Sequence, residues 1–354
     1  MSDHSEFTVS SSSGRYDVQI GTGLFARAVD DAAVVVIDAA LADRMPAGDR
    51  PVLTLTADED TKTLAGCERL ILAMRAAGVR RGDHVVAVGG GVVQDVATFV
   101  TDVYMRGLPW SYVPTTLMAM ADSCIGGKSS INVGGVKNLV GGIYPPSRVV
   151  VDPAFLATLD STARAAGLSE AAKIAFCRGG VAFEGYLDRY ARFEDDPGDL
   201  IDHVLRAKRW FVETDEHDHK ERRLLNFGHT FGHALEAAVD HAVPHGVAVA
   251  IGVLCAGSHP AAASGPLTGA LLAHCRELVG QAPGVPAALS RFDPRTYERA
   301  FRSDKKHSAT AFRLIVPAAA GSVVEVETGN GPQDWATVLA VTERTLDSLG
   351  RPRA

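Results

Sequence analysis

Three histidines within seventeen residues are the part of this sequence whose types and spacing most clearly allow chemistry. His229 and His233 stand four residues apart in the segment 226–234, and His245 follows in a Pro-His-Gly turn before the apolar segment 246–256. Two histidines at this spacing on a helix lie on one face, one turn from each other. Because clustered imidazoles in a mostly apolar frame suit a divalent transition metal, the sequence indicates a metal site.

The residues alone do not identify the remaining ligand of this expected metal site. The H-x-x-x-H spacing resembles that of zinc proteases, but Thr230 stands where their catalytic glutamate would be, which argues against a protease. A catalytic zinc site usually holds three protein ligands and keeps one open position. A carboxylate of the same half of the chain can complete it, and the sequence alone does not choose between Glu170, Glu184 and Glu213.

A second feature, the glycine run 89–91, ends an apolar segment and precedes a helical one. Glycines at such a turn let the backbone approach a pyrophosphate, and the helix N-terminus supplies N–H groups and a positive dipole end. The spacing is not G-x-G-x-x-G, so a tight strand-to-helix turn with no ligand remains an alternative. Asp38, after an earlier apolar segment, is placed to accept hydrogen bonds from a ribose.

A third feature is a set of cations in a loop rich in glycine, serine and asparagine. Lys128 and Lys137 are the only charges between residues 126 and 146. Two lysines in such a loop suit phosphate binding. Further cations stand at Arg106, Lys208, Arg222, Lys305 and Lys306.

Composition narrows the classes of protein that carry these features. The chain has 354 residues, 46% apolar and 22% charged, which fits a globular protein of two domains. Its net charge of −7 argues against nucleic-acid or membrane-surface partners. The absence of a signal-peptide pattern and five scattered cysteines without a C-x-x-C pair predict a cytoplasmic location.

The elements that must position these residues change character along the chain. Short apolar strands are expected at 33–38, 52–55, 84–88, 110–113 and 148–151, with helices at 63–77 and 94–104. This alternation predicts a parallel sheet covered by helices. After residue 160 strands nearly vanish, and 163–212 and 229–263 are read as successive helices. We therefore expect an α/β domain over residues 1–165 and an all-α domain over residues 166–354.

The ordered motifs resemble those of dehydroquinate synthase and the wider sugar phosphate cyclases, over roughly residues 34–316. They are Glu59-x-x-Lys62, Gly89-Gly-Gly-x-x-x-Asp95, Tyr104-Met-Arg-Gly, Val113-Pro-Thr-Thr, Asp122-Ser-x-x-Gly-Gly-Lys128, Lys137-Asn-Leu, Glu170-x-x-Lys173, Asn226-Phe-Gly-His-Thr-Phe-Gly-His233, His245-Gly and Asp304-Lys-Lys306.

The resemblance implies a Rossmann-like NAD domain, a helical metal domain and an active site between them. It implies that Glu170, His229 and His245 hold a divalent zinc or cobalt ion. It implies NAD contacts from Asp38, Glu59, Lys62, Gly90, Gly91, Asp95, Thr115, Thr116 and Thr158. It implies a substrate site made by Asp122, Lys128, Asn138, Lys173, Lys208, Arg222, Asn226, His233, Lys305 and Lys306. It also implies a homodimer in which Arg106 reaches the neighbouring subunit's site.

The activity implied by the resemblance is the conversion of a phosphorylated sugar or sugar acid into a carbocycle, with loss of phosphate and no net redox change. Lys208, Arg222 and Asn226 favour a carboxylate-bearing substrate, as in 3-dehydroquinate synthase. Departures from the usual family pattern, such as Gln94 before Asp95 and the run 142–146, leave open a cyclase of secondary metabolism acting on sedoheptulose 7-phosphate or glucose 6-phosphate.

Two functions from other classes of protein fit the sequence less well. Iron-type alcohol and glycerol dehydrogenases share this architecture and combine NAD with a histidine-rich metal site, but Lys128 and Lys137 argue against them. A catalytically inactive binding module is the other alternative, and the presence of all three matched metal ligands argues against it.

Overall fold

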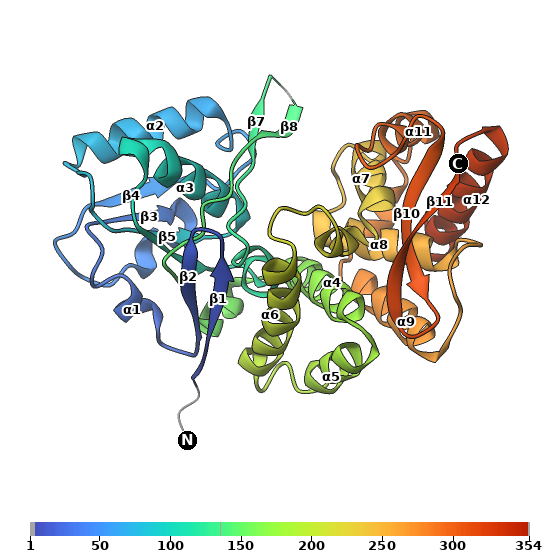
Figure 1. The fold of residues 1–354 in the computed structure, drawn as a ribbon, viewed down its shortest axis with the longest axis horizontal. Helices are drawn as coiled ribbons and strands as arrows, with labels where there is room; N and C mark the ends of the chain where they lie inside the picture. The colour runs from blue at the N-terminus through green and yellow to red at the C-terminus, as the bar shows by residue number, and fades with distance from the viewer. Residues whose placement is uncertain (1–3, 135, 353–354) are drawn as a thin grey trace. The chain divides into compact units, whose positions relative to one another are not determined.

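The computed structural model describes residues 4–134 and 136–352. They form two compact units (Figure 1). The first unit comprises Met1–Thr158 and Asp196–Leu205, and the second comprises Leu159–Asp195 and Arg206–Ala354. The domain boundary expected between residues 165 and 166 stays a prediction.

A seven-stranded sheet forms the centre of the first unit, in the order β1-β2-β9-β6-β5-β3-β4. Every neighbouring pair is parallel except β1 and β2, which form an antiparallel hairpin. The predicted strands are all present, and the sheet gains β1 and β2, which we did not expect. The bounds are β1 Ser5–Ser11, β2 Gly14–Ile20, β3 Val34–Asp38, β4 Val52–Leu55, β5 Val85–Gly89, β6 Trp110–Pro114 and β9 Arg148–Val151.

The central strands form because their residues suit a sheet that is covered on both faces. All five residues of β5 and all five of β6 are buried. Such continuous apolar runs are typical of parallel strands between helices. The helices of this unit are α1 Phe25–Ala28, α2 Leu64–Ala76 and α3 Gly91–Val103, and α2 and α3 pack against each other (Figure 1). A small hairpin, β7 Ile131–Val133 with β8 Val136–Val140, extends from the unit.

The strand order has one reversal, and it lies beside the glycine turn. From β3 the chain moves outward to β4, and it then returns to the other side of β3 to form β5. Ligands of open parallel sheets bind at such a switch point, beyond the carboxyl ends of the strands. Asp38 ends β3 and Gly89 ends β5, so both stand at this edge of the sheet.

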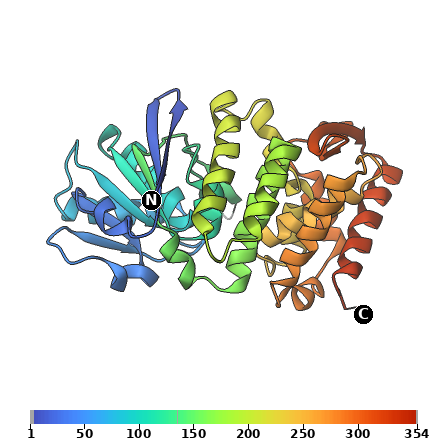
Figure 2. The same ribbon diagram turned by 90° about the horizontal axis from the view of Figure 1, so that it is seen from below.

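The second unit is mainly helical, as expected. Its helices are α4 Ser161–Arg178, α5 Gly180–Tyr190, α6 Pro197–Thr214 from Arg206 onward, α7 His229–Ala238, α8 His245–Ser258, α9 Pro266–Gly280, α10 Val285–Leu289, α11 Pro294–Arg302 and α12 Pro332–Ser348. Helix α12 (red) packs on α8 (Figure 2).

The expectation of an all-α domain needs one correction. Strands β10 Ala311–Ala318 and β11 Ser322–Gly329 form an antiparallel hairpin in this unit. Phe312, Leu314 and Val316 are buried at alternate positions, because successive side chains of a strand point to opposite faces.

Glycines allow the helices that carry the histidines to approach closely. A Cβ on Gly246 of α8 would stand 2.2 Å from the Ala166 carbonyl oxygen of α4. A Cβ on Gly252 would stand 2.0 Å from the Gly228 carbonyl oxygen, at the start of α7. Since real atoms do not approach so closely, only glycine permits α8 to lie against both neighbours. This packing brings residues of α4, α7 and α8 to one place.

Within the described residues, no helix has the length and apolar character needed to cross a membrane.

Candidate metal and nucleotide sites

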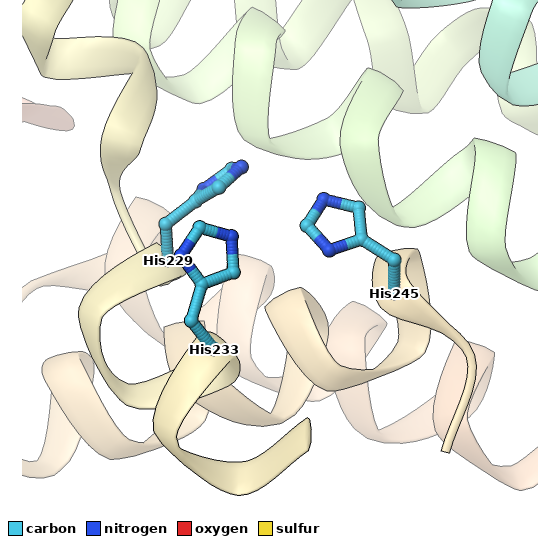
Figure 3. Close-up of side chains that lie close together, drawn as sticks. All are labelled: His229, His233 and His245. Atoms are coloured by element: carbon cyan, nitrogen blue, oxygen red, sulfur yellow. The ribbon is translucent and has the colours of Figure 1, made fainter. Parts of the chain in front are cut away.

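Four predicted residues of the second unit converge on one point. Glu170 comes from α4, His229 and His233 come from α7, and His245 is the first residue of α8. Glu170 Oε1 lies 3.7 Å from His229 Nε2 and 3.5 Å from His245 Nε2. One nitrogen of each histidine lies within 4.8 Å of the others, and Figure 3 shows the three rings gathered together. The structure therefore distinguishes Glu170 from Glu213, which pairs with Arg209 at 2.9 Å.

The two histidines closest to Glu170 are oriented by their other ring nitrogens. His229 Nδ1 lies 3.2 Å from the Phe227 carbonyl oxygen, an acceptor that requires the proton to be on Nδ1. His245 Nδ1 lies 3.1 Å from Glu236 Oε2, which likewise accepts. Both rings thus present an unprotonated Nε2 toward Glu170 when they are neutral, which is the arrangement of metal-binding histidines.

The spacing of these three ligand atoms fits a zinc-sized ion. Nitrogen and oxygen atoms that bind zinc at about 2.0 to 2.1 Å in a tetrahedron stand about 3.4 Å apart. The observed 3.5 and 3.7 Å separations are close to this value. The Glu170 side chain is 1% exposed and that of His245 is 37% exposed, so the cluster is open to solvent on the His245 side. The donor set has the chemistry and the opening that a catalytic divalent metal needs.

The charge on Glu170 is stabilised in this buried place. Burial alone would raise the pKa of Glu170, but Lys173, His229 and His245 outweigh it and hold that pKa well below its usual range. Lys173 Nζ stands 2.5 Å from Glu170 Oε2, one turn along α4. The pKa of His229 is lowered, first by burial and then by Lys173. An ionised carboxylate and a neutral imidazole are the forms that bind a metal. Burial opposes protonation of His245, but its bonds with Glu170 and Glu236 raise its pKa to about 10, so a metal must displace a proton from that ring.

Glu236 is part of this cluster and was not among the predicted residues. It lies on α7, two turns after His229, and its carboxylate touches His245 on α8. Burial opposes ionisation of Glu236, but the bond with His245 lowers the pKa of the carboxyl overall. The three- and seven-residue spacings from His233 and His229 place all three on one helix face, and this is the signal that sequence reasoning overlooked.

His233 and the predicted lysine pair lie on the same side of the second unit. Burial lowers the pKa of His233, and the charges of His245 and Lys306 add to that effect. Lys306 Nζ forms a 2.8 Å ion pair with Asp304, while Lys305 is exposed. Glu236 and Asp304 oppose these two cations, so the neighbourhood of His233 holds charges of both signs.

The residues expected to meet a substrate carboxylate lie on α6 and in the 3-10 helix that follows it. Lys208 of α6 and Arg222 of the 3-10 helix Glu221–Asn226 are both buried. Arg222 Nη1 donates to the Glu216 carbonyl oxygen at 2.6 Å. Asp215 organises this turn, because its carboxylate accepts backbone N–H bonds from residues 219, 220 and 222. Asn226 Nδ2 donates to the Arg223 carbonyl oxygen at 3.0 Å.

In the first unit, the glycine turn is built as an open backbone cradle. Tyr112 of β6 donates from its hydroxyl to the carbonyl oxygens of Gly89, at 2.9 Å, and Gly90, at 3.2 Å. Gly90 precedes α3 and has no side chain to cap it, and no heavy atom lies within 4 Å of the position of a Cβ on Gly91. Unpaired N–H groups at a helix start beside open space fit a phosphate group.

The predicted NAD contacts are distributed around this edge of the sheet. The Thr115 backbone N–H donates to the Gly89 carbonyl oxygen at 3.0 Å, and a Cβ on Gly90 would stand 2.9 Å from the Thr116 methyl group. Asp38 accepts a hydrogen bond from the Ala40 N–H, next to the switch point. Thr158 lies further away along the sheet, after β9, and its hydroxyl donates to the Phe155 carbonyl oxygen.

The other three predicted NAD residues engage side chains of their own unit. Lys62 and Asp95 form a buried ion pair at 2.7 Å. Burial raises the pKa of Asp95 despite the opposing effect of Lys62. Glu59 accepts a hydrogen bond from Asn132 Nδ2 at 2.8 Å.

Two of the predicted substrate-site residues line one pocket. Lys128 and Asn138 line an open pocket of about 380 Å³, together with other residues of the segments 128–130 and 138–143. Asn138 has a positive φ of 55° and its N–H donates to Asn132 Oδ1 at 2.9 Å. Asp122 lies nearby in the chain, in the π-helical turn Ala119–Ser123.

Arg106 belongs to a strained exposed turn. Met105 and Arg106 have φ values of 50° and 67°, which L side chains rarely adopt. Both are exposed, and Gly107 follows with a φ of 111°. The turn holds the Arg106 guanidinium away from the core of the first unit.

Comparison with known proteins matches two family models along the chain. The model for the N-terminal part of 3-dehydroquinate synthase matches residues 52–166, and the model for its C-terminal part matches residues 167–307. The chain is similar to the 3-dehydroquinate synthase of Lactiplantibacillus plantarum, with 39% identity over 279 residues, which are 76% of this chain and 75% of the relative.

Two solved structures are similar in fold. A 2-epi-5-epi-valiolone synthase from Streptomyces hygroscopicus, with NAD+ and Zn2+ bound, is 28% identical and has a TM-score of 0.71, covering 93% of this chain and 97% of that one. A 2-deoxy-scyllo-inosose synthase with carbaglucose-6-phosphate, NAD+ and Co2+ is 20% identical and has a TM-score of 0.76, covering 96% and 100%.

Proposed function

The chain belongs to the 3-dehydroquinate synthase family, and on that premise we propose that it is an NAD- and metal-dependent sugar phosphate cyclase. It eliminates phosphate from a phosphorylated sugar or sugar acid and closes a carbocycle. The observation that carries the proposal is the meeting of Glu170 Oε1 with the Nε2 atoms of His229 and His245, at 3.7 and 3.5 Å.

Glu170, His229 and His245 hold one divalent ion, zinc or cobalt. When bound, the ion supplies Lewis acidity to a hydroxyl or carbonyl oxygen of the substrate. The similar valiolone synthase structure, with Zn2+ and NAD+, supports this assignment. Lys173 keeps Glu170 ionised, and the Phe227 carbonyl oxygen keeps the His229 ring turned with Nε2 toward the ion.

Residues at the switch point of the sheet would hold NAD, which would supply a hydride acceptor. The backbone of Gly90 and Gly91 at the start of α3 would hold its pyrophosphate, and Asp38 would bind its ribose. The uncapped helix start and the open space beside Gly91 support this placement. The remaining contacts are assigned to Glu59, Lys62, Asp95, Thr115, Thr116 and Thr158.

The substrate phosphate is held by Lys128 and Asn138 in their shared pocket. Asp122 is assigned to the same substrate site. The positive charge of Lys128 stabilises the phosphate as its bond to carbon breaks. His233 and the neighbouring cations Lys305 and Lys306 bind the sugar's oxygens on the metal side.

The proposed substrate bears a carboxylate, as in 3-dehydroquinate synthase. Lys208 and Arg222 are buried cations, and a guanidinium suits two-point binding of a carboxylate. Asn226 ends the 3-10 helix that carries Arg222. A seven-carbon sugar acid carries such a carboxylate.

A second candidate is a specialised cyclase that acts on sedoheptulose 7-phosphate or glucose 6-phosphate. The observation in its favour is the 28% identity to a valiolone synthase over 93% of this chain. Gln94 and the segment 142–146, which depart from the usual dehydroquinate synthase pattern, point the same way.

We assign the assembly as a homodimer in which Arg106 completes the partner's phosphate site. The exposed, strained turn at Met105 and Arg106 supports this assignment, because strain is retained where function requires a particular side-chain direction. We also propose a cytoplasmic location and a domain boundary after residue 165, as the sequence predicts.

A panel of substrates tests the function directly. The purified chain, loaded with zinc or cobalt and NAD, is incubated separately with 3-deoxy-arabino-heptulosonate 7-phosphate, sedoheptulose 7-phosphate and glucose 6-phosphate. Release of inorganic phosphate together with a carbocyclic product, and no lasting rise in NADH absorbance, is the expected result for one of them. Steady NADH formation from simple polyols without phosphate release would instead identify a dehydrogenase.

A further inference from the structure

Two successive residues of α3 hold the two ends of the segment 123–130. Gln94 Nε2 donates to the Ser123 carbonyl oxygen at 2.6 Å, and Ser123 Oγ donates to Gln94 Oε1 at 2.5 Å. The next residue, Asp95, accepts from the Ser130 N–H at 2.9 Å and from Ser130 Oγ at 3.3 Å. One turn of one helix therefore fixes where this segment begins and where it ends.

The Gln94 bonds are specific and well protected from water. Gln94 is 4% exposed, and its amide oxygen and nitrogen each have a partner on Ser123. This two-point contact sets both the position and the rotation of Ser123. A buried amide that lost this partner would carry an unsatisfied polar group, so the contact is costly to break. Ser123 ends the π-helical turn Ala119–Ser123.

The second contact rests on a buried ion pair. Asp95 Oδ2 is 2.7 Å from Lys62 Nζ, and the Lys62 side chain is 9% exposed. The Lys62 carbonyl oxygen also accepts from the Asn132 N–H at 2.9 Å, just beyond Ser130. The C-terminal end of the segment is thus tied to α3 and to the chain before α2.

The segment between these two contacts needs such support. It contains Gly126 and Gly127, both in positive φ, at 100° and 62°. Glycine backbone has more freedom to lose than any other, so this run depends on contacts from outside it. The Gly126 N–H donates to the Tyr16 hydroxyl at 2.9 Å, and the Gly127 carbonyl oxygen accepts from the Tyr144 N–H at 2.8 Å. Lys128 follows directly, and Asp122 precedes Ser123. Lys128, proposed to hold the substrate phosphate, and Asp122, proposed to line the substrate site, thus flank a segment that α3 holds at both ends.

We propose that Gln94 is a positioning residue for substrate phosphate: together with Asp95 it clamps the segment 123–130 and so holds Lys128 and Asp122 in place. This inference rests on the proposed function, because it takes the Lys128 pocket as the phosphate site. Gln94 itself touches no substrate. It acts through Ser123, which does not line the pocket that residues 128–130 help to form.

The test removes the contact from each side and measures phosphate binding. Gln94→Leu keeps the volume and removes both bonds, Ser123→Ala removes one bond, and Ser123→Thr keeps the hydroxyl. Thr98→Val is the matched control, because Thr98 lies one turn further along α3, is 0% exposed and has no hydrogen-bond partner for its hydroxyl. The probe is inorganic phosphate, titrated into the NAD- and zinc-loaded enzyme by calorimetry.

We expect Gln94→Leu to weaken phosphate binding about tenfold, as loss of a buried two-point contact would. Ser123→Ala should weaken it less, and the double variant should be no worse than Gln94→Leu, because both substitutions remove one shared interaction. Ser123→Thr and Thr98→Val should bind phosphate as the wild type does. With the true substrate, Gln94→Leu should raise KM and leave kcat nearly unchanged.

Three results would overturn the inference. The first is that Gln94→Leu and Ser123→Ala bind phosphate within twofold of the wild-type affinity. The second is that Thr98→Val loses as much phosphate affinity as Gln94→Leu. The third is that the wild type binds no phosphate. A lower Tm with lower kcat but unchanged KM would show a merely structural role, and it too would contradict positioning. If Gln94→Leu does not fold, Ser123→Ala carries the test. Turnover of the wild type on the sugar phosphate panel is measured separately, so failure of the proposed function is distinguishable from failure of the clamp.

Discussion

The contact between Glu236 and His245 predicts a measurable contribution to metal affinity. Glu236 Oε2 accepts from His245 Nδ1 at 3.1 Å and leaves His245 Nε2 facing Glu170. In Glu236→Gln the amide oxygen still accepts this bond, but the charge that favours the imidazole as a donor is gone. In Glu236→Leu the bond itself is lost, and the ring is free to turn Nε2 away from Glu170.

The expected loss of metal affinity follows from the position of Glu236, which hydrogen-bonds a metal ligand and does not bind the metal itself. Loss of such a partner commonly lowers metal affinity by about 10- to 100-fold, which corresponds to about 1.4 to 2.7 kcal/mol. We expect Glu236→Gln near the lower value, because an acceptor remains, and Glu236→Leu near the upper value. The Glu236 side chain is 15% exposed, so thermal unfolding of each variant is measured to verify that the fold is kept.

The assay is a competition between the apoprotein and a chelator of known affinity, with zinc as the metal. Cobalt absorption spectra of the same variants report any change of coordination. Glu298→Gln is the matched control. Glu298 pairs with Arg302 on the surface of α11, and its substitution removes one negative charge from the same unit. Zinc affinity of Glu236→Leu equal to that of the control would refute the reasoning.

Four further predictions follow from the site. His229→Ala should lose the metal and all turnover, as measured by metal analysis and phosphate release; full metal content with full activity would reject His229 as a ligand. Arg222→Ala should raise KM for the sugar acid by a factor equivalent to about 2 to 5 kcal/mol if the carboxylate pair is buried, and an unchanged KM would reject the carboxylate pocket. Mixing inactive Arg106→Ala with inactive Lys128→Ala should restore part of the activity through hybrid dimers; no recovery would argue against a shared site. Burial would raise the pKa of Asp215, but backbone N–H donors lower it overall. The stabilising effect of the ionised carboxylate is therefore present above about pH 4 and is lost as the pH falls through the folded pKa. The thermal stability of Asp215→Asn should lack this acid dependence, and a pH profile identical to that of the wild type would contradict the prediction.

The strands and helices that could be predicted are those with a strong local pattern. Strand β5 is a continuous apolar run that ends in glycine, and the first unit follows from the alternation of such runs with helices. Strands β1 and β2 carried a signal that was overlooked: Phe7, Val9, Tyr16 and Val18 alternate with polar residues and are buried on one face. Among serines and charged residues this period of two is easily taken for a loop.

Some contacts of the candidate site follow from local sequence, and others depend on tertiary packing. The facing of His229 and His233 follows from helix geometry and was predictable. The choice of Glu170 over other carboxylates needed the packing of α4 against α8, which depends on Gly246 meeting the Ala166 carbonyl oxygen. The contact of Glu236 with His245 joins two helices, and no spacing in the sequence specifies it.

The ligand set of the metal is the central claim, and anomalous X-ray diffraction at the zinc edge tests it most directly. Crystals of the zinc- and NAD-loaded protein should give one strong anomalous peak, about 2.0 to 2.2 Å from Glu170 Oε1, His229 Nε2 and His245 Nε2. A peak held by the three histidines without Glu170, or a peak elsewhere in the molecule, would contradict the account.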